Sequence, residues 1–161
     1  MIRSAFGLSL LFGMGMMMIG CGDDGSTGDG GECDQGRVRC DGVCIDAIEP
    51  TLASIQTGVF NVSCAASACH DASMPQPLES PLDLSSLSAS QAGLIGVASV
   101  QVPTLDRVEP GDSSASYLMN KILGDDDIIP LGFSQMPLGG MLCQPKIDVI
   151  EQWIDGGAPI Q

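Results

Sequence analysis

Apolar residues recur at helical spacing in four segments of the chain, and polar runs rich in Gly, Ser and Pro separate these segments. The clearest segment lies near the C-terminal end, where Ile147, Ile150 and Ile154 repeat at i, i+3 and i+7 and Trp153 adds to the same side. Pro145 suits the first turn of this helix, and a pair of glycines ends it. The pattern predicts a terminal helix with one buried face.

Three further helices are predicted upstream. The first covers 50–62, the second covers 87–99 after the cap candidate Ser86, and the third begins at the N-cap Asp112 and ends at Gly124. Their apolar positions include Leu52, Ile55, Val59, Leu118 and Ile122. No stretch shows sustained alternation of apolar and polar residues with a period of two, so we expect an all-α domain with long connections rich in proline.

The first twenty residues are typical of an export signal. Arg3 is their one charged side chain, and the apolar run 8–19 that follows is too short to cross a membrane as a stable helix. The tetrapeptide 18–21 resembles a bacterial lipobox, which implies cleavage before Cys21 and attachment of lipid to its thiol. An ordinary secretory signal is the alternative. By the same resemblance, Gly22 in place of Asp directs the protein to the outer membrane.

The charge of the chain is strongly negative. Its 20 Asp and Glu residues outnumber 6 Lys and Arg residues, which gives a formal net charge of −14 at pH 7. This balance argues against binding to nucleic acid or to anionic lipid through a basic patch, so the lipid on Cys21 would be the membrane attachment. Residues 22–32 contain five Gly and four acidic residues and no apolar residue, which predicts a flexible tether.

A cysteine-rich segment follows at 33–46, where Cys33, Cys40 and Cys44 lie among Gly, Asp and Arg. In an exported and oxidising setting, this segment predicts disulfides. A metal site is the weaker alternative, because no His is near and the spacings differ from those of zinc sites. Three cysteines can form only one disulfide among themselves and leave one thiol unpaired, so Cys143 is the candidate partner for a long-range disulfide. The four cysteines allow three pairings, and the sequence does not choose among them.

The chemistry of the chain is concentrated at Cys64-Ala-Ala-Ser-Ala-Cys69-His70, directly after the first predicted helix, where His70 is the only histidine. Covalent haem attachment requires this set of groups: each thiol adds across a vinyl group of the haem, and the adjacent His ligates the iron. The usual motif has two residues between the cysteines. Here there are four, so the loop between the two thioethers has to bulge. The alternative is a local disulfide between Cys64 and Cys69, with His70 as a bystander.

A second iron ligand is predicted in the stretch 130–140. Met136 offers a thioether there, and Pro137 stiffens the backbone beside it. Met141 is the second choice for this ligand, because it lacks the rigid setting. A methionine that packs in the core is the alternative interpretation of Met136.

From about residue 52 to residue 159, about two thirds of the chain, the sequence resembles a single-haem c-type cytochrome domain of exported bacterial proteins. The matching pieces, in order, are the helix before CAASACH, the element PLDLSS, the segment VEPGDSSASYLMNKILG, the Met136-Pro137 pair and the closing IEQWIDGGA. The resemblance implies a small all-α fold, like that of cytochrome c, in which the first and last helices pack across one another. It also implies that Cys64 and Cys69 bind one haem c, with His70 and Met136 as axial ligands.

The sequence thus predicts four parts. These are a lipoprotein signal peptide at 1–20, a lipidated cysteine and acidic tether at 21–32, a disulfide segment at 33–46 and a haem domain at 48–161.

The function expected of these parts is electron transfer. A lipid-anchored carrier would face the periplasm or the surface of a Gram-negative cell, and His/Met ligation leaves no open iron position for a substrate. Its acidic surface predicts transient docking on a basic patch of a redox partner protein. One alternative is a haem-free, disulfide-stapled surface lipoprotein with a binding or structural role. A peroxidase-like enzyme is disfavoured, because no second His serves acid–base chemistry.

Overall fold

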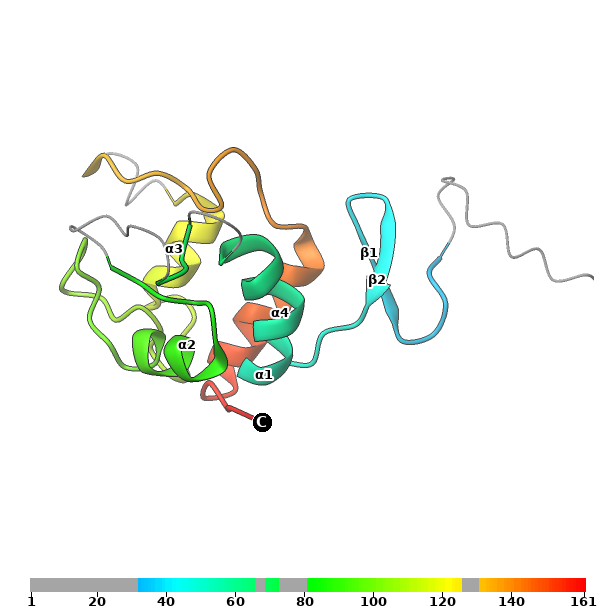
Figure 1. Cartoon of the computed structure of the whole chain (residues 1–161), viewed down its shortest axis with the longest axis horizontal. Coiled ribbons are helices and arrows are strands. Elements are labelled where there is room, and N and C mark those ends of the chain that lie inside the picture. Colours follow the sequence, from blue (N-terminus) through cyan, green and yellow to red (C-terminus); the bar gives the residue numbers. More distant parts are fainter. Residues whose placement is uncertain (1–31, 66–68, 73–80, 126–130) are drawn as a thin grey trace, which may run out of the picture.

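The computed structural model describes residues 32–65, 69–72, 81–125 and 131–161. Its elements are β1 (Arg37–Cys40), β2 (Val43–Asp46), α1 (Leu52–Ile55), the π-helix η1 (Gln56–Cys64), α2 (Leu87–Leu94), α3 (Tyr117–Leu123) and α4 (Gln144–Asp155). The helices form one body, and the β1–β2 hairpin lies at its side (Figure 1). The predicted signal peptide, Cys21 and the tether up to residue 31 lie outside the described residues. Within those residues, no helix combines the length and the apolar character needed to cross a membrane.

The prediction of an all-α fold is wrong, because β1 and β2 form a two-stranded antiparallel sheet. Arg37 lies opposite Asp46, and the Nε of Arg37 is 3.6 Å from a carboxylate oxygen of Asp46. Asp41 and Gly42 form the turn, with φ of 51° and 86°. An Asp-Gly pair at positive φ favours a two-residue hairpin turn, because the twist of that turn matches the twist of the strands. The described fold is therefore mixed, with helices and a hairpin.

Two disulfides hold the hairpin, and the prediction of disulfides in this segment is confirmed. Cys33–Cys44 joins β2 to the residues before β1, with a Cα–Cα distance of 5.7 Å. Cys40–Cys143 joins β1 to the start of α4 across a sequence separation of 103 residues. Of the three pairings that the sequence allowed, the structure contains this one.

The helix predicted over 50–62 is present as two parts, α1 and η1. Thr51 caps α1, because its hydroxyl accepts a hydrogen bond from the Ser54 N–H at 3.3 Å. Gly58 in η1 allows the preceding chain to approach closely, since a Cβ at this position would lie 2.7 Å from Cδ1 of Ile48. π-Helical turns are rare and occur frequently at functional sites. In this chain, η1 leads directly to the first thiol of the predicted motif.

The second predicted helix is shorter than expected. α2 follows the N-cap Ser86, whose hydroxyl accepts a hydrogen bond from the Ala89 N–H at 3.2 Å. It ends at Leu94 because Ile95 is extended and forms a β-bridge with Val108. A contact with a distant residue thus stops this helix, and the local pattern contains no sign of it.

The last two helices end where the sequence predicts. α3 begins later than expected, at Tyr117, and Asp112 instead accepts a backbone hydrogen bond at 3.1 Å within the preceding turn. Gly124, at φ 69°, ends α3. α4 has Pro145 in its first turn and ends at the C-cap Gly156, so the predicted terminal helix is confirmed.

The core lies where α1 and η1 meet α4 (Figure 1). Its most deeply buried large side chains are Leu52, Ile55, Val59, Phe60, Ile150, Trp153 and Ile154. The indole N–H of Trp153 donates to the Pro159 carbonyl at 2.9 Å, and the Leu52 N–H at the start of α1 donates to the same carbonyl at 2.9 Å. The C-terminal segment therefore ties α4 to α1.

Candidate functional site

The two thiols of the predicted motif lie at and just beyond the end of η1. Cys64 is the last residue of η1 and is half-buried, whereas Cys69 is exposed. Two disulfides take four of the six cysteines among the described residues, and Cys64 and Cys69 are the two that stay reduced. The structure therefore lacks the local disulfide that was the alternative interpretation of this pair.

His70 is held by its main chain and its ring. Its N–H donates to the Cys64 carbonyl at 3.0 Å, and its own carbonyl accepts from the Leu84 N–H at 2.8 Å. The ring Nδ1 lies 3.2 Å from the Leu82 carbonyl oxygen. Because a carbonyl can only accept, Nδ1 carries the ring proton and Nε2 keeps its lone pair. This is the tautomer in which a His binds a metal through Nε2.

The segment that supports His70 is itself tied to η1. The side-chain amide of Gln56 is buried, and its Nε2 donates to the Leu84 carbonyl at 2.8 Å and to Oδ1 of Asn61 at 2.7 Å. Hydrogen bonds through Leu84 therefore connect the segment of His70 to the helix that carries Cys64.

The environment keeps His70 neutral. Burial lowers the pKa of this side chain, the hydrogen bond to Leu82 raises it, and the charges of Lys121 and Arg107 lower it further. A lowered pKa means that the imidazole holds its metal-binding, neutral form at more acidic pH than an exposed histidine.

The Cys64 thiol stays protonated at neutral pH. Burial raises its pKa to about 11, although the charge of Lys146 lowers it, and Cys69 adds to the rise. Lys146 lies near Cys64, since its ammonium is 3.4 Å from the hydroxyl of the preceding residue, Ser63. The first turn of α4 therefore lies next to the end of η1. A neutral S–H group supplies both the sulfur and the hydrogen that add across a carbon–carbon double bond.

The predicted methionine ligand lies on a segment that runs along α3. The Met136 N–H donates to the Lys121 carbonyl at 2.8 Å, and Nε2 of Gln135 donates to the Ile122 carbonyl at 3.0 Å. The Lys121 ammonium also donates to the Ser134 carbonyl. Three hydrogen bonds thus fix the backbone around Met136 to one helix.

The two candidate methionines differ in exposure. Met136 is half-buried, whereas 68% of Met141 is exposed. No hydrogen bond between described residues joins Met136 to His70. Lys121 is near both residues, because its carbonyl accepts from the Met136 N–H and its charge lowers the pKa of His70. The structure therefore groups the thiols with the histidine and places Met136 on a neighbouring segment.

Two cationic residues at this place were not predicted from the sequence. Arg107 donates from Nη1 to the Gly93 carbonyl at 2.8 Å and from Nη2 to the Pro81 carbonyl at 3.1 Å, next to the residue that accepts from His70. Lys121, in α3, is only 9% exposed. The available signal was a lysine among the apolar residues of a short helix, and the helical pattern gives such a lysine no role.

Exposed apolar side chains gather on the same segments. Of the eight large ones among the described residues, Val62 lies near the end of η1, Leu123 is the last residue of α3, and three lie between α3 and α4: Leu131, Leu138 and Met141. Single exposed apolar side chains are common on protein surfaces, so their exposure alone assigns no ligand to these segments. The two thiols, the neutral imidazole and the thioether are donor types that occur in haem proteins.

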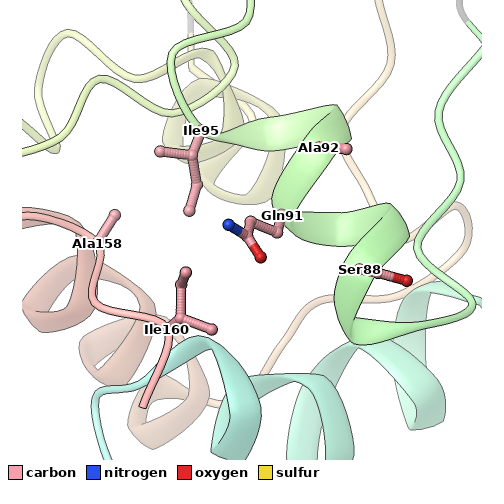
Figure 2. A pocket seen from close by; sticks show the side chains of 6 residues that line it. All are labelled: Ser88, Gln91, Ala92, Ile95, Ala158 and Ile160. Atoms are coloured by element: carbon pink, nitrogen blue, oxygen red, sulfur yellow. The ribbon is translucent and has the colours of Figure 1, made fainter.

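A hollow in the described part of the chain lies elsewhere. It has a volume of about 510 Å³ and lies between α2 and the C-terminal segment, where Gln91, Ile95 and Ile160 point toward one another (Figure 2). The other lining residues are Ser88, Ala92 and Ala158. This lining contains no titratable side chain, so we assign no chemistry to it.

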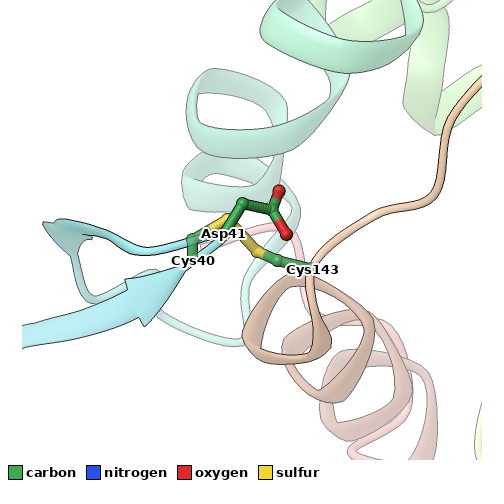
Figure 3. Close-up of side chains that lie close together, drawn as sticks. All are labelled: Cys40, Asp41 and Cys143. Carbon is green, nitrogen blue, oxygen red and sulfur yellow. A yellow bond between two sulfur atoms is a disulfide. The ribbon is translucent and has the colours of Figure 1, made fainter. Parts of the chain in front are cut away.

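A second group of metal-ligand types lies at the hairpin. Cys40, Asp41 and Cys143 bring their side-chain donor atoms within 4.8 Å of one another (Figure 3). The two sulfur atoms are joined in the Cys40–Cys143 disulfide, so neither is a thiolate ligand. This favours the prediction of disulfides over a metal site in the cysteine-rich segment.

Comparison with known proteins gives no match: no family model, no curated protein and no solved structure matches this chain. The resemblance to c-type cytochromes therefore stays a prediction that depends on the residues themselves.

Proposed function

We propose that this chain is an exported protein that binds one haem c and transfers single electrons. The observation that carries the proposal is the division of the cysteines. In the part of the chain that the structure describes, disulfides take four cysteines, and the two reduced thiols both belong to the motif that ends at the sole histidine. This motif contains the groups that covalent haem attachment requires.

Each candidate residue has one role in this proposal. Cys64 and Cys69 each form a thioether, in which sulfur bonds to one vinyl carbon and the thiol hydrogen moves to the other, so no oxidant is needed. His70, through Nε2, and Met136, through its sulfur, would hold the iron. Haem c would supply an iron that alternates between the ferric and ferrous states. Because two protein ligands would leave no open iron position for a substrate, we assign no catalytic residue and favour a carrier over an enzyme.

The proposal includes export and a lipid anchor at Cys21, a residue outside the described part of the chain. The two disulfides support an oxidising compartment. In a bacterial host that processes lipoproteins, we expect the protein in the membrane fraction and a Cys21→Ala variant in the soluble fraction. A Cys21→Ala variant that stays with the membrane would contradict the anchor.

The attachment sites can be tested by staining for haem after a denaturing gel. We expect a stained band for the protein exported in a host that attaches haem c. Cys64→Ala and Cys69→Ala should each keep one thioether and shift the reduced absorption band, whereas a double Cys33→Ala/Cys44→Ala variant should keep both. An unstained protein beside a stained control cytochrome would contradict the proposal.

The alternative function is a haem-free surface lipoprotein stapled by disulfides. The Cys40–Cys143 disulfide favours it, because this bond joins the hairpin to the helical body as in small stapled domains. The alternative predicts that Cys64 and Cys69 oxidise to a disulfide in the exported protein. Thiol counting on the exported protein after denaturation and reduction separates the two functions, because a Cys64–Cys69 disulfide then releases two thiols and thioethers to haem release none.

A further inference from the structure

A buried lysine beside the candidate iron ligands has no acidic partner among the described residues. Lys121 is 9% exposed, and its ammonium donates to the neutral Ser134 carbonyl. The one ion pair between two described residues is Arg37–Asp46, on the hairpin. Burying a charge is costly unless an opposite charge compensates it. Among the described residues, the partner of the Lys121 ammonium is thus a neutral carbonyl.

Arg107 is a second cation whose hydrogen-bond partners among the described residues are neutral carbonyls. It is half-buried, and its guanidinium donates to the two neutral carbonyls of Pro81 and Gly93. Pro81 precedes Leu82, whose carbonyl faces the His70 ring. Arg107 thus lies on the segment that supports His70, and Lys121 lies on the helix that supports Met136. Each candidate ligand has one cation on its own support.

The two cations also lie on segments that carry the candidate site. Arg107 donates to Pro81, next to the Leu82 carbonyl at the His70 ring, and the Lys121 carbonyl accepts from the Met136 N–H. A third cation, Lys146, lies at the end of η1 through the contact with Ser63. The described basic residues are Arg37, Arg39, Arg107, Lys121 and Lys146. Three of these five lie around the thiol–imidazole motif of a chain whose net charge is −14.

We infer that Lys121 and Arg107 bind the two carboxylates of the haem. This inference rests on the proposed function and names the part of the ligand that the two cations recognise. A haem joins an apolar ring to two anionic carboxylates, so a site for it needs apolar side chains and cations together. Lys121 and Arg107 supply the charge, and the carboxylates supply the anions that these two cations lack among the described residues. Hydrogen bonds between two charged groups are stronger than bonds to neutral carbonyls.

The test compares two porphyrins on one protein. In a Cys64→Ala/Cys69→Ala background, haem binds without thioethers, so its affinity can be measured by absorption titration. The probes are iron protoporphyrin IX and its dimethyl ester, which has no carboxylate charge. We expect the background protein to bind the diacid about tenfold more tightly than the diester.

Variants then assign the preference to residues. Lys121→Gln and Arg107→Gln should each reduce the preference for the diacid, and Lys121→Arg should restore most of it. Arg37→Gln removes a cation from the hairpin and should leave the preference unchanged. Far-ultraviolet circular dichroism shows whether each variant is folded before its titration is interpreted.

Equal affinity for the diacid and the diester in the background protein would overturn the inference, and that result needs no variant to fold. Absence of binding by either porphyrin would also overturn it, because the carboxylate contacts would then contribute no measurable affinity. Neither result decides the proposed function, which is judged by covalent haem on the unsubstituted chain.

Discussion

Two main-chain hydrogen bonds and one ring hydrogen bond fix the position of His70. Met136 is fixed through its own N–H and through the side chain of Gln135, both bonded to α3. Ligands whose positions are fixed by neighbouring groups lose little freedom when they bind a metal. At the scale of single residues, the proposed ligation of iron by His70 and Met136 therefore depends on neighbouring groups that substitutions can test one at a time.

Replacing Met136 by Leu removes the sulfur ligand and keeps a similar side-chain volume. In the haem-loaded protein, we expect loss of the ferric absorption band of iron–sulfur ligation and a lower reduction potential, because Met ligation raises the potential. Absorption spectroscopy and potentiometry measure the two effects. Met141→Leu is the matched control, since Met141 is 68% exposed. If Met141→Leu removes the band and Met136→Leu does not, the assignment is reversed.

The two thiols should differ in reactivity before haem is attached. Cys69 is exposed, whereas burial raises the pKa of Cys64 to about 11. A thiolate is the reactive form, so alkylation of Cys64 should rise about tenfold per pH unit until the pH nears that pKa. Timed alkylation followed by peptide mass spectrometry measures each site. Equal labelling of both thiols at pH 8 would contradict the burial of Cys64.

The sequence revealed site residues whose chemistry is narrow, and it missed those whose role depends on burial. Two thiols beside the only His predicted covalent haem attachment from the sequence alone, with a local disulfide as the alternative. Lys121 looks like an ordinary surface residue of a helix, and Arg107 looks like part of a turn. Their proposed role depends on hydrogen bonds to the Ser134 and Pro81 carbonyls, which no local pattern predicts.

At the scale of elements, α1 and α4 hold the body together through Trp153. This side chain is fully buried, and its N–H donates to the carbonyl that also accepts from the start of α1. We expect Trp153→Ala to lower the free energy of unfolding by about 3–5 kcal/mol, through lost burial and a cavity. Urea unfolding measures the loss. The control Gln152→Ala, at an exposed position of α4, should change it by less than about 0.5 kcal/mol. Similar losses for both variants would contradict this role of Trp153.

The Cys40–Cys143 disulfide should stabilise the fold more than the Cys33–Cys44 disulfide does. It closes a separation of 103 residues, whereas Cys33–Cys44 closes one of 11. In the chain-entropy account, a longer loop gives more stabilisation, so a double Cys40→Ser/Cys143→Ser variant should lose about 2–4 kcal/mol. Thermal or urea unfolding compares the two double variants. A larger loss from removal of Cys33–Cys44 would contradict the prediction.

The elements differ in how well local sequence predicts them. α4 has a clear apolar face, a proline in its first turn and a terminating glycine, and both of its ends were predicted. The hairpin was missed because its strands are too short for sustained alternation, although Asp41-Gly42 is a strong hairpin signal. The π-helical geometry of η1 was also missed. Its tight contact at Gly58 involves Ile48, so helical spacing alone does not specify it.

At the scale of the whole molecule, the charge of −14 governs long-range encounters. We propose that the redox partner offers a basic patch, so electron transfer with a basic carrier should slow as ionic strength rises. Stopped-flow kinetics over a salt series measures this slope. A neutral small reductant is the control and should show a weak dependence. A flat profile with the basic carrier would remove the steering claim.

The central claim is that Cys64 and Cys69 carry a covalent haem, and the intact mass of the exported protein tests it most directly. The mature chain is made in a host that attaches haem c and is then denatured. Its intact mass and its absorption spectrum are measured. The account predicts a mass increase of one haem that survives denaturation, together with sharp absorption bands on reduction. A colourless protein of unmodified mass, with Cys64 joined to Cys69 and a control cytochrome from the same host fully loaded, would contradict it.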